Sequence, residues 1–152
     1  MDVRFRIRRF EPEAGREPYY QEYPLEVPEY ATVLDALIQI REEVDGTLGL
    51  RCSCRSAICG SCAMRIDGHA RLACKTKVVS LAPQGGEVTV EPAGNMPVVK
   101  DLIVDMQPFW DKVRAVEPWL QPEGPPPERE YVVANEAMLD LAGAMNCIMC
   151  GA

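Results

Sequence analysis

The first part of the chain alternates between apolar and polar positions, which predicts two paired strands. Residues 2–9 place an apolar side chain at every second position, with arginines between them, which is the period of a half-buried strand. Turn-forming residues follow at 11–18, and alternation returns over residues 23–27. Pro24 has no N–H for the sheet ladder, so we expect the second strand at an edge or an irregularity. The apolar face of the first strand comprises Val3, Phe5 and Ile7.

A helix is predicted next. The run Thr32-Val-Leu-Asp35 resembles a capping box, with Asp in place of the usual Glu or Gln. Apolar residues then recur at helical spacing, and Asp45-Gly46 ends the helix. The positions that follow this spacing are Val33, Leu34, Leu37, Ile38 and Arg41.

The middle of the chain predicts a hairpin and a last strand. Residues 63–66, the turn pair Asp67-Gly68 and residues 70–74 have the pattern of a short hairpin. Residues 87–91 alternate again after two glycines. Strands and one helix around a cysteine-rich loop predict an α+β fold.

From Val98 the composition changes, and the pattern predicts helices. Apolar residues follow helical spacing over 98–116, interrupted by Pro108. Residues 121–127 are proline-rich and predict a stiff linker, and residues 129–146 are helical in pattern. We therefore expect a domain boundary near residues 100–125.

Composition narrows the functional classes. The 152 residues are 47% hydrophobic, enough for a core, and the net charge of −7 disfavours nucleic-acid binding. No apolar stretch reaches 18 residues and the start lacks a secretion signal, so we expect a cytoplasmic protein. In that compartment seven cysteines indicate metal ligands or free thiols more than disulfides.

Positive charge is concentrated in one segment. Residues 51–77 hold six basic residues and one acid, a net charge of +5, which leaves −12 for the rest. Such charge favours thiolate ligands and an added electron, although these residues could equally be solvated surface charges. The basic residues are Arg51, Arg55, Arg65, Arg71, Lys75 and Lys77.

Four cysteines carry the strongest chemical signal. Cys54, Cys59 and Cys62 are spaced C-x4-C-x2-C, and Cys74 follows eleven residues later, the plant-type arrangement for a [2Fe–2S] cluster. We expect Cys54 and Cys59 to reach one iron, and Cys62 and Cys74 the other. Gly60 would let the backbone approach the inorganic sulfides and donate hydrogen bonds.

Two other interpretations of the cysteines stay open. Zinc sites commonly pair ligands at C-x2–4-C, and Cys52 could join Cys54, Cys59 and Cys62 in a four-thiolate zinc site. The cysteines could also be inert buried thiols. His69 beside the hairpin turn is expected to be a solvated surface residue.

The sequence resembles the N-terminal part of the iron–sulfur subunit of succinate dehydrogenase and fumarate reductase. Its fourth cysteine comes much sooner than in photosynthetic ferredoxins. The matching motifs lie at residues 32–37, 53–55, 58–64, 66–68, 72–74, 101–106 and 147–151.

The resemblance implies a β-grasp [2Fe–2S] ferredoxin-like domain over residues 1–105 and the start of a helical ferredoxin-type domain over residues 106–152. It implies that Cys54, Cys59, Cys62 and Cys74 hold the cluster, and that [4Fe–4S] and [3Fe–4S] clusters occur only in a longer chain. It also implies a flavoprotein (FAD) partner and membrane anchor subunits with quinone. The chain would then lie on the inner face of the cell membrane as a non-catalytic electron-transfer subunit.

The sequence departs from the family pattern in two places. Ser56-Ala57 stands where the family commonly has Glu-Gly, which changes the freedom of the loop. Cys147 and Cys150 are two ligands of a C-x2-C-x2-C run whose later members are missing, so we expect a fragment with an incomplete [4Fe–4S] motif. The alternative function is a free-standing soluble [2Fe–2S] ferredoxin, for which the extension over residues 98–150 has no use.

Overall fold

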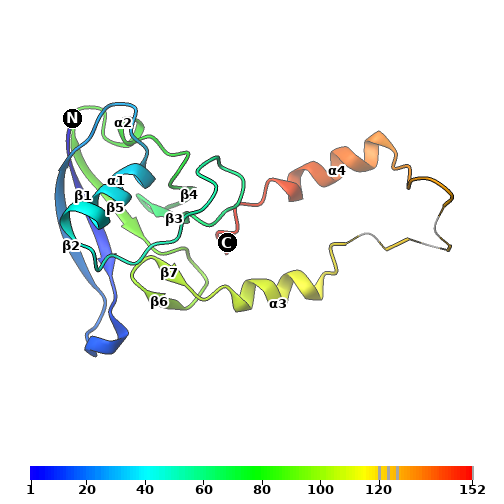
Figure 1. Ribbon diagram of the computed structural model, residues 1–152, viewed down its shortest axis with the longest axis horizontal. Coiled ribbons are helices and arrows are strands. Elements are labelled where there is room, and N and C mark those ends of the chain that lie inside the picture. Colours follow the sequence, from blue (N-terminus) through cyan, green and yellow to red (C-terminus); the bar gives the residue numbers. More distant parts are fainter. Residues whose placement is uncertain (120, 123, 126, 152) are drawn as a thin grey trace.

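Five strands form one sheet in the computed structural model, which describes residues 1–119, 121–122, 124–125 and 127–151. Their order in space is β2-β1-β5-β3-β4, with β1 and β5 parallel and the other neighbours antiparallel. With the helices that follow, this confirms the α+β prediction (Figure 1). The strands are β1 (Asp2–Arg9), β2 (Tyr19–Glu26), β3 (Ala63–Ile66), β4 (His69–Leu72) and β5 (Gly86–Glu91).

The predicted N-terminal hairpin is confirmed. Strands β1 and β2 pair antiparallel from Asp2–Glu26 to Arg9–Tyr19, across a turn that contains the short 3-10 helix η1 (Pro12–Ala14). Strand β2 lies at the sheet edge, where Pro24 is tolerated. The predicted apolar face of β1 is buried together with the apolar residues of β5.

The predicted capping box is also confirmed. The side chain of Thr32 accepts from the backbone N–H of Asp35, and the Asp35 carboxylate accepts from the N–H of Thr32. These bonds start α1 (Val33–Gln39), which continues as one π-helical stretch, η2 (Ile40–Val44), up to Asp45. The buried side chains of α1 belong to the same core as those of β1.

The hairpin of β3 and β4 turns at Asp67 and Gly68, both in the left-handed region at φ 47° and 76°. Its return strand is shorter than predicted, because β4 ends at Leu72 and Cys74 lies in the turn beyond it. The Leu72 carbonyl accepts from the N–H groups of Lys75 and Thr76, which closes that turn. A short helix follows, α2 (Val78–Leu81).

The prediction of a helix starting at Val98 is wrong for its first part. Residues 98–104 form a small hairpin of β6 (Val98–Lys100) and β7 (Ile103–Val104). Its turn residue Asp101 is fully buried at φ 47°, and tertiary hydrogen bonds to its carboxylate hold this non-helical conformation. Helix α3 (Gln107–Ala115) begins after it, with Pro108 in its first turn.

The C-terminal prediction is confirmed in part. Helix α4 (Asn135–Met145) lies within the predicted range of 129–146 but begins later. Leu120, Glu123 and Pro126, in and beside the expected linker, lie outside the described residues. Figure 1 shows α3 and α4 extending away from the sheet, and the chain then returning toward β3 and β4. No helix in the described ranges is long and apolar enough to cross a membrane.

A buried arginine joins the parts of the fold, and the sequence pattern did not reveal it. Arg9 is on the inward face of β1, with its side chain only 1% exposed. Its guanidinium donates to Asp101 Oδ1 at 2.9 Å, Asp45 Oδ2 at 2.6 Å and Thr47 Oγ1 at 2.8 Å. Asp101 also accepts from the backbone N–H groups of Phe10 at 2.9 Å and Gly49 at 2.8 Å. The Arg9 network therefore connects β1, the end of η2 and the β6–β7 hairpin.

This network keeps Asp45 ionised and Tyr23 neutral. Burial opposes ionisation of Asp45, but hydrogen bonds from Thr47, Tyr23 and Arg9 outweigh it and hold the pKa of Asp45 well below its ordinary value. Burial also raises the pKa of Tyr23, and the hydrogen bond to Asp45 raises it further. The buried charges are thus compensated, as an ion network needs to be stable.

We predict that Arg9→Met destabilises the fold by about 3–5 kcal/mol, because it leaves buried carboxylates without a partner. The matched control is Arg4→Met on the outer face of the same strand, where a 58% exposed side chain faces Glu22 at 3.6 Å. That change should cost less than about 1 kcal/mol. Urea denaturation followed by circular dichroism measures both, and equal losses would contradict a structural role for the network.

Candidate metal centre

The cysteine loop, residues 51–62, is wound by backbone conformations that bring sulfur atoms inward. Arg55, Ala57 and Gly60 adopt left-handed φ values of 54°, 58° and 68°. Mixed left- and right-handed residues turn successive N–H groups toward one side, where they can hold negative charge. The loop can therefore surround an anionic group with backbone donors.

Cys54 and Cys59 form one pair within this loop. The Cys54 sulfur accepts from the N–H groups of Ser56 and Cys59, both at 3.3 Å, and the Cys54 N–H lies 3.5 Å from the Cys59 sulfur. A hydrogen bond at 3.3 Å also joins the Cys59 sulfur to Oγ of Ser61. Each sulfur of this pair thus has polar hydrogen-bond partners.

Cys62 and Cys74 form the second pair, between the loop and the turn after β4. The Ala73 N–H donates to the Cys62 carbonyl at 3.1 Å, which brings the turn beside the loop. Burial raises the pKa of the Cys62 thiol to about 11, and the neighbouring Cys74 sulfur contributes to its shift. Cys62 is only 4% exposed, whereas Cys74 is half-buried.

The two pairs differ in their electrostatics. Hydrogen bonds with Ser61 first, and then with Cys54, lower the pKa of the Cys59 thiol to about 6. Cys59 is therefore ready to act as a thiolate at neutral pH, while Cys62 needs positive charge nearby before it gives up its proton. An iron at the Cys62 position would supply that charge.

The donor set fits a [2Fe–2S] group. All seven cysteines are free thiols, and the four at cluster spacing lie as two neighbouring pairs. In the described residues, no three or more His, Cys, Asp or Glu side chains are gathered closely enough to hold a metal ion. A two-iron cluster takes two thiolates at each iron, which is the arrangement of these pairs.

The remaining predicted residues have different surroundings. Cys52 is half-buried and lines a hollow together with Gly60, Ser61, Trp110 and Met149. His69 is exposed, as expected, with Nδ1 2.8 Å from the Asp67 carbonyl.

The second cysteine motif lies near the first. Cys147 is exposed and Cys150 is half-buried, and the Met149 N–H lies 3.4 Å from the Cys147 sulfur. Ile148 and Met149, between these two cysteines, lie against Gly60 of the cysteine loop. This proximity was not expected from sequence, because more than 80 residues separate the second motif from the loop.

The basic residues of the segment lie mostly on the surface. Arg55, Arg65, Lys75 and Lys77 are exposed, and Arg71 is half-buried. None of the six forms an ion pair within 4 Å with an acid in the described part of the chain. Their charge is thus free to act on a group in the loop or on a partner.

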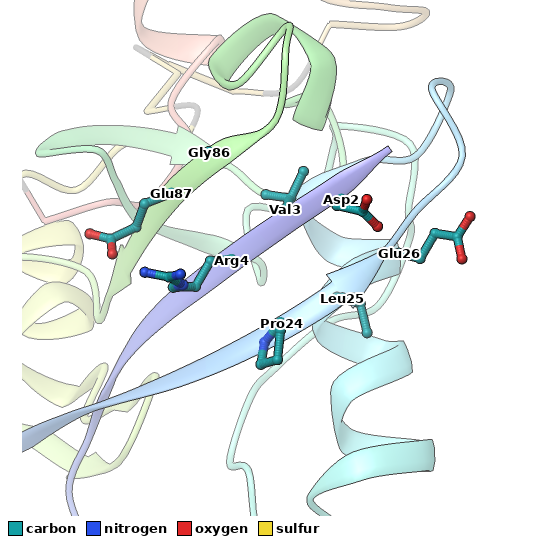
Figure 2. Close-up of a pocket in the computed structure, with 8 residues that line it drawn as sticks. All are labelled: Asp2, Val3, Arg4, Pro24, Leu25, Glu26, Gly86 and Glu87. Carbon is teal, nitrogen blue, oxygen red and sulfur yellow. The ribbon is translucent and has the colours of Figure 1, made fainter.

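Another hollow, of about 560 Å³, lies on the charged face of the sheet, where β1, β2 and β5 run together (Figure 2). Arg4 and Glu87 are neighbours in register there. The lining is made by strands and not by the cysteine loop, so this hollow is separate from the candidate centre. It is lined by Asp2, Val3, Arg4, Pro24, Leu25, Glu26, Gly86 and Glu87.

Comparison with known proteins agrees with this geometry. Residues 4–111 match the family described as 2Fe-2S iron-sulfur cluster binding domain. The succinate dehydrogenase iron-sulfur subunit of Paracoccus denitrificans is 41% identical over 148 residues, which are 97% of this chain and 56% of that protein. The fumarate reductase iron-sulfur subunit of Mycobacterium tuberculosis is 38% identical over 149 residues, 95% of this chain and 60% of that protein.

A solved structure has the same fold. A chain of the Mycobacterium smegmatis Sdh1 complex in the apo form matches with a TM-score of 0.77 at 27% identity, over 98% of this chain and 60% of that one. The chain spans little more than half the length of the curated relatives it matches. It belongs to the 2Fe-2S iron–sulfur cluster binding domain family, as a homologue of the iron–sulfur subunits of succinate dehydrogenase and fumarate reductase.

Proposed function

We propose that this chain is an electron-transfer subunit in which Cys54, Cys59, Cys62 and Cys74 hold a [2Fe–2S] cluster. The observation that carries the proposal is the pairing of these cysteines within the segment that matches the cluster-binding family. When bound, such a cluster supplies one-electron chemistry. The chain itself makes and breaks no bonds of a substrate.

The chain's own residues would tune and protect the centre. Backbone N–H groups of Ser56 and Cys59 aim at the Cys54 sulfur, and such donors favour the state with more negative charge. The hydrogen bond with Ser61 likewise lowers the pKa of Cys59. Burial of Cys62 would keep water from the iron that Cys62 and Cys74 hold. The protein would thus set both the reduction potential of the cluster and the access of solvent to it.

The names of the relatives support a proposal about the partners. Proteins named as succinate dehydrogenase and fumarate reductase iron-sulfur subunits are 38–41% identical to the chain. We propose that it exchanges electrons with a flavoprotein (FAD) partner and, through membrane anchor subunits, with quinone. With such partners the chain would lie on the inner face of the cell membrane. In a longer chain Cys147 and Cys150 would supply two ligands of a [4Fe–4S] cluster, with a [3Fe–4S] cluster beyond.

Exposed apolar side chains favour a complex over a free-standing ferredoxin. Proposed domains of residues 1–105 and 106–152 would place α3 and α4 in the second domain, and these helices expose large apolar residues. A carrier that docks only briefly has no use for such a surface, whereas a partner would cover it. The exposed residues in these helices include Trp110, Met138, Leu139 and Leu141, and Val116 and Trp119 follow just after α3.

The cysteine loop contains an alanine in the left-handed conformation, at a position where the family commonly has glycine. Ala57 has φ 58°, a conformation that is unfavourable for a residue with a Cβ atom. It lies between Cys54 and Cys59, whose sulfurs hold the loop together through hydrogen bonds. We propose that a bound cluster offsets this strain by fixing both cysteines.

The first test measures cluster content. After anaerobic purification we expect about two irons and two acid-labile sulfides per chain. Cys59→Ser should lose most of this content and of the visible absorbance, because it removes a proposed ligand. The control Cys52→Ser should keep both, and equal loss in the two variants would refute the assignment. Zinc in place of iron would favour the zinc alternative.

The second test concerns the partner. When the tagged chain is expressed at native level, we expect a large flavin-containing protein to purify with it in a constant ratio. Flavin absorbance and mass spectrometry identify that protein. A clean monomer that supports full ferredoxin-dependent reductase activity would instead favour the free-standing carrier.

The third test changes the left-handed residue. Ala57→Gly should raise the unfolding free energy of the cluster-free protein by up to about 1 kcal/mol, because glycine adopts positive φ without strain. The same change at Ala70, an exposed position in β4, should lower it by about 0.5–1 kcal/mol. A loss of stability at both sites would show that Ala57 is not strained.

A further inference from the structure

The C-terminal segment, residues 147–151, lies against the cysteine loop. Figure 1 shows the chain returning from α4 to end beside β3 and β4. Ile148 is half-buried against the hydrophobic core. Met149 lines the hollow that also contains Gly60 and Ser61. The segment is therefore packed on the first domain, although α4 before it is exposed.

Gly60 is the point of closest approach. It is buried at φ 68°, and a Cβ atom there would lie 2.6 Å from Met149 Cε and 2.9 Å from the Ile148 carbonyl oxygen. The methyl group of Met149 could swing away, because it ends a flexible side chain. The carbonyl oxygen could not, since it belongs to the backbone of the segment.

A second glycine secures the other end of the segment. Gly151 has φ 75°, and a Cβ atom there would lie 2.6 Å from the Gly94 carbonyl oxygen and 3.0 Å from Met96 Cε. Gly94 precedes β6 and is distant from the cysteine loop in sequence. Both contacts require backbone to approach backbone without a side chain between them.

We propose that two side-chain-free contacts, Gly60 against Ile148 and Gly151 against Gly94, seat the second cysteine pair against the cysteine loop. Gly60 lies between Cys59 and Cys62, and it contacts the two residues between Cys147 and Cys150. The loop that holds Cys59 and Cys62 therefore meets the segment that holds Cys147 and Cys150 at the contact between Gly60 and the Ile148 carbonyl oxygen. This contact fixes the separation of the two cysteine groups. The value of a fixed separation rests on the proposed electron-transfer function, but the docking itself does not.

The test compares two glycine variants by a brief hydroxyl-radical pulse and peptide mass spectrometry. Methionine oxidation follows exposure, so the oxidation rate of Met149 is divided by that of Met145, which is 75% exposed in the same protein. In Gly60→Ala this ratio should rise about twofold to threefold, because the segment is displaced. The matched control is Gly68→Ala, with φ 76° and nothing within 4 Å of the added Cβ.

The outcomes separate the docking from the function. A ratio that rises in both Gly60→Ala and Gly151→Ala supports the proposal, because the added Cβ in Gly151→Ala meets Gly94 and Met96 and not Met149 itself. A ratio that stays at the wild-type value in Gly151→Ala, or that rises equally in Gly68→Ala, overturns it. If Gly60→Ala fails to fold or loses its iron, Gly151→Ala decides, since that residue is outside the loop: a raised ratio supports docking and an unchanged ratio refutes it. Iron and sulfide content of the wild-type protein judges the proposed function independently.

Discussion

The buried guanidinium of Arg9 is the interaction on which the arrangement of this fold depends. One side chain ties β1 to the segment after η2 through Asp45 and Thr47, and to the β6–β7 hairpin through Asp101. Asp101 in turn holds the backbone of Gly49, five residues before Cys54. Because buried charges demand full compensation, these segments cannot shift separately. The chain that enters the cysteine loop therefore starts from a fixed position.

The conformation of the cysteine loop then determines how its four cysteines are arranged. Left-handed residues turn its N–H groups toward sulfur, and the four cysteines lie as a half-buried, hydrogen-bonded pair and a second pair in which Cys62 is buried. The difference between a Cys59 pKa of about 6 and a Cys62 pKa of about 11 reflects these surroundings. Such asymmetry would give the two irons of the proposed cluster unequal environments, which is one of the ways in which proteins set a reduction potential.

The fold also brings a second cysteine motif to the first. Contacts at Gly60 and Gly151 leave no room for side chains, so the C-terminal segment touches the loop through its backbone. The helices between the two motifs expose several large apolar side chains, a surface that a partner could cover. Docking of the motif and exposure of the helices are consistent with a relay that works inside a larger complex.

The sequence by itself determined the α+β class, the capped helix at Thr32, both hairpins of the sheet and the four cysteines at cluster spacing, because alternation, capping and ligand spacing are local signals. It did not determine that Arg9 is buried, because its charge suggests the surface and its partners lie up to 92 residues away. The helical spacing after Val98 was misleading for the same reason, since the bonds to Asp101 outweigh local preference there. Only the tertiary structure decided that Cys74 follows β4 rather than lying in it, and that residues 147–151 lie against Gly60. Contacts between segments distant in sequence produce no periodic pattern of apolar residues, so sequence analysis does not detect them.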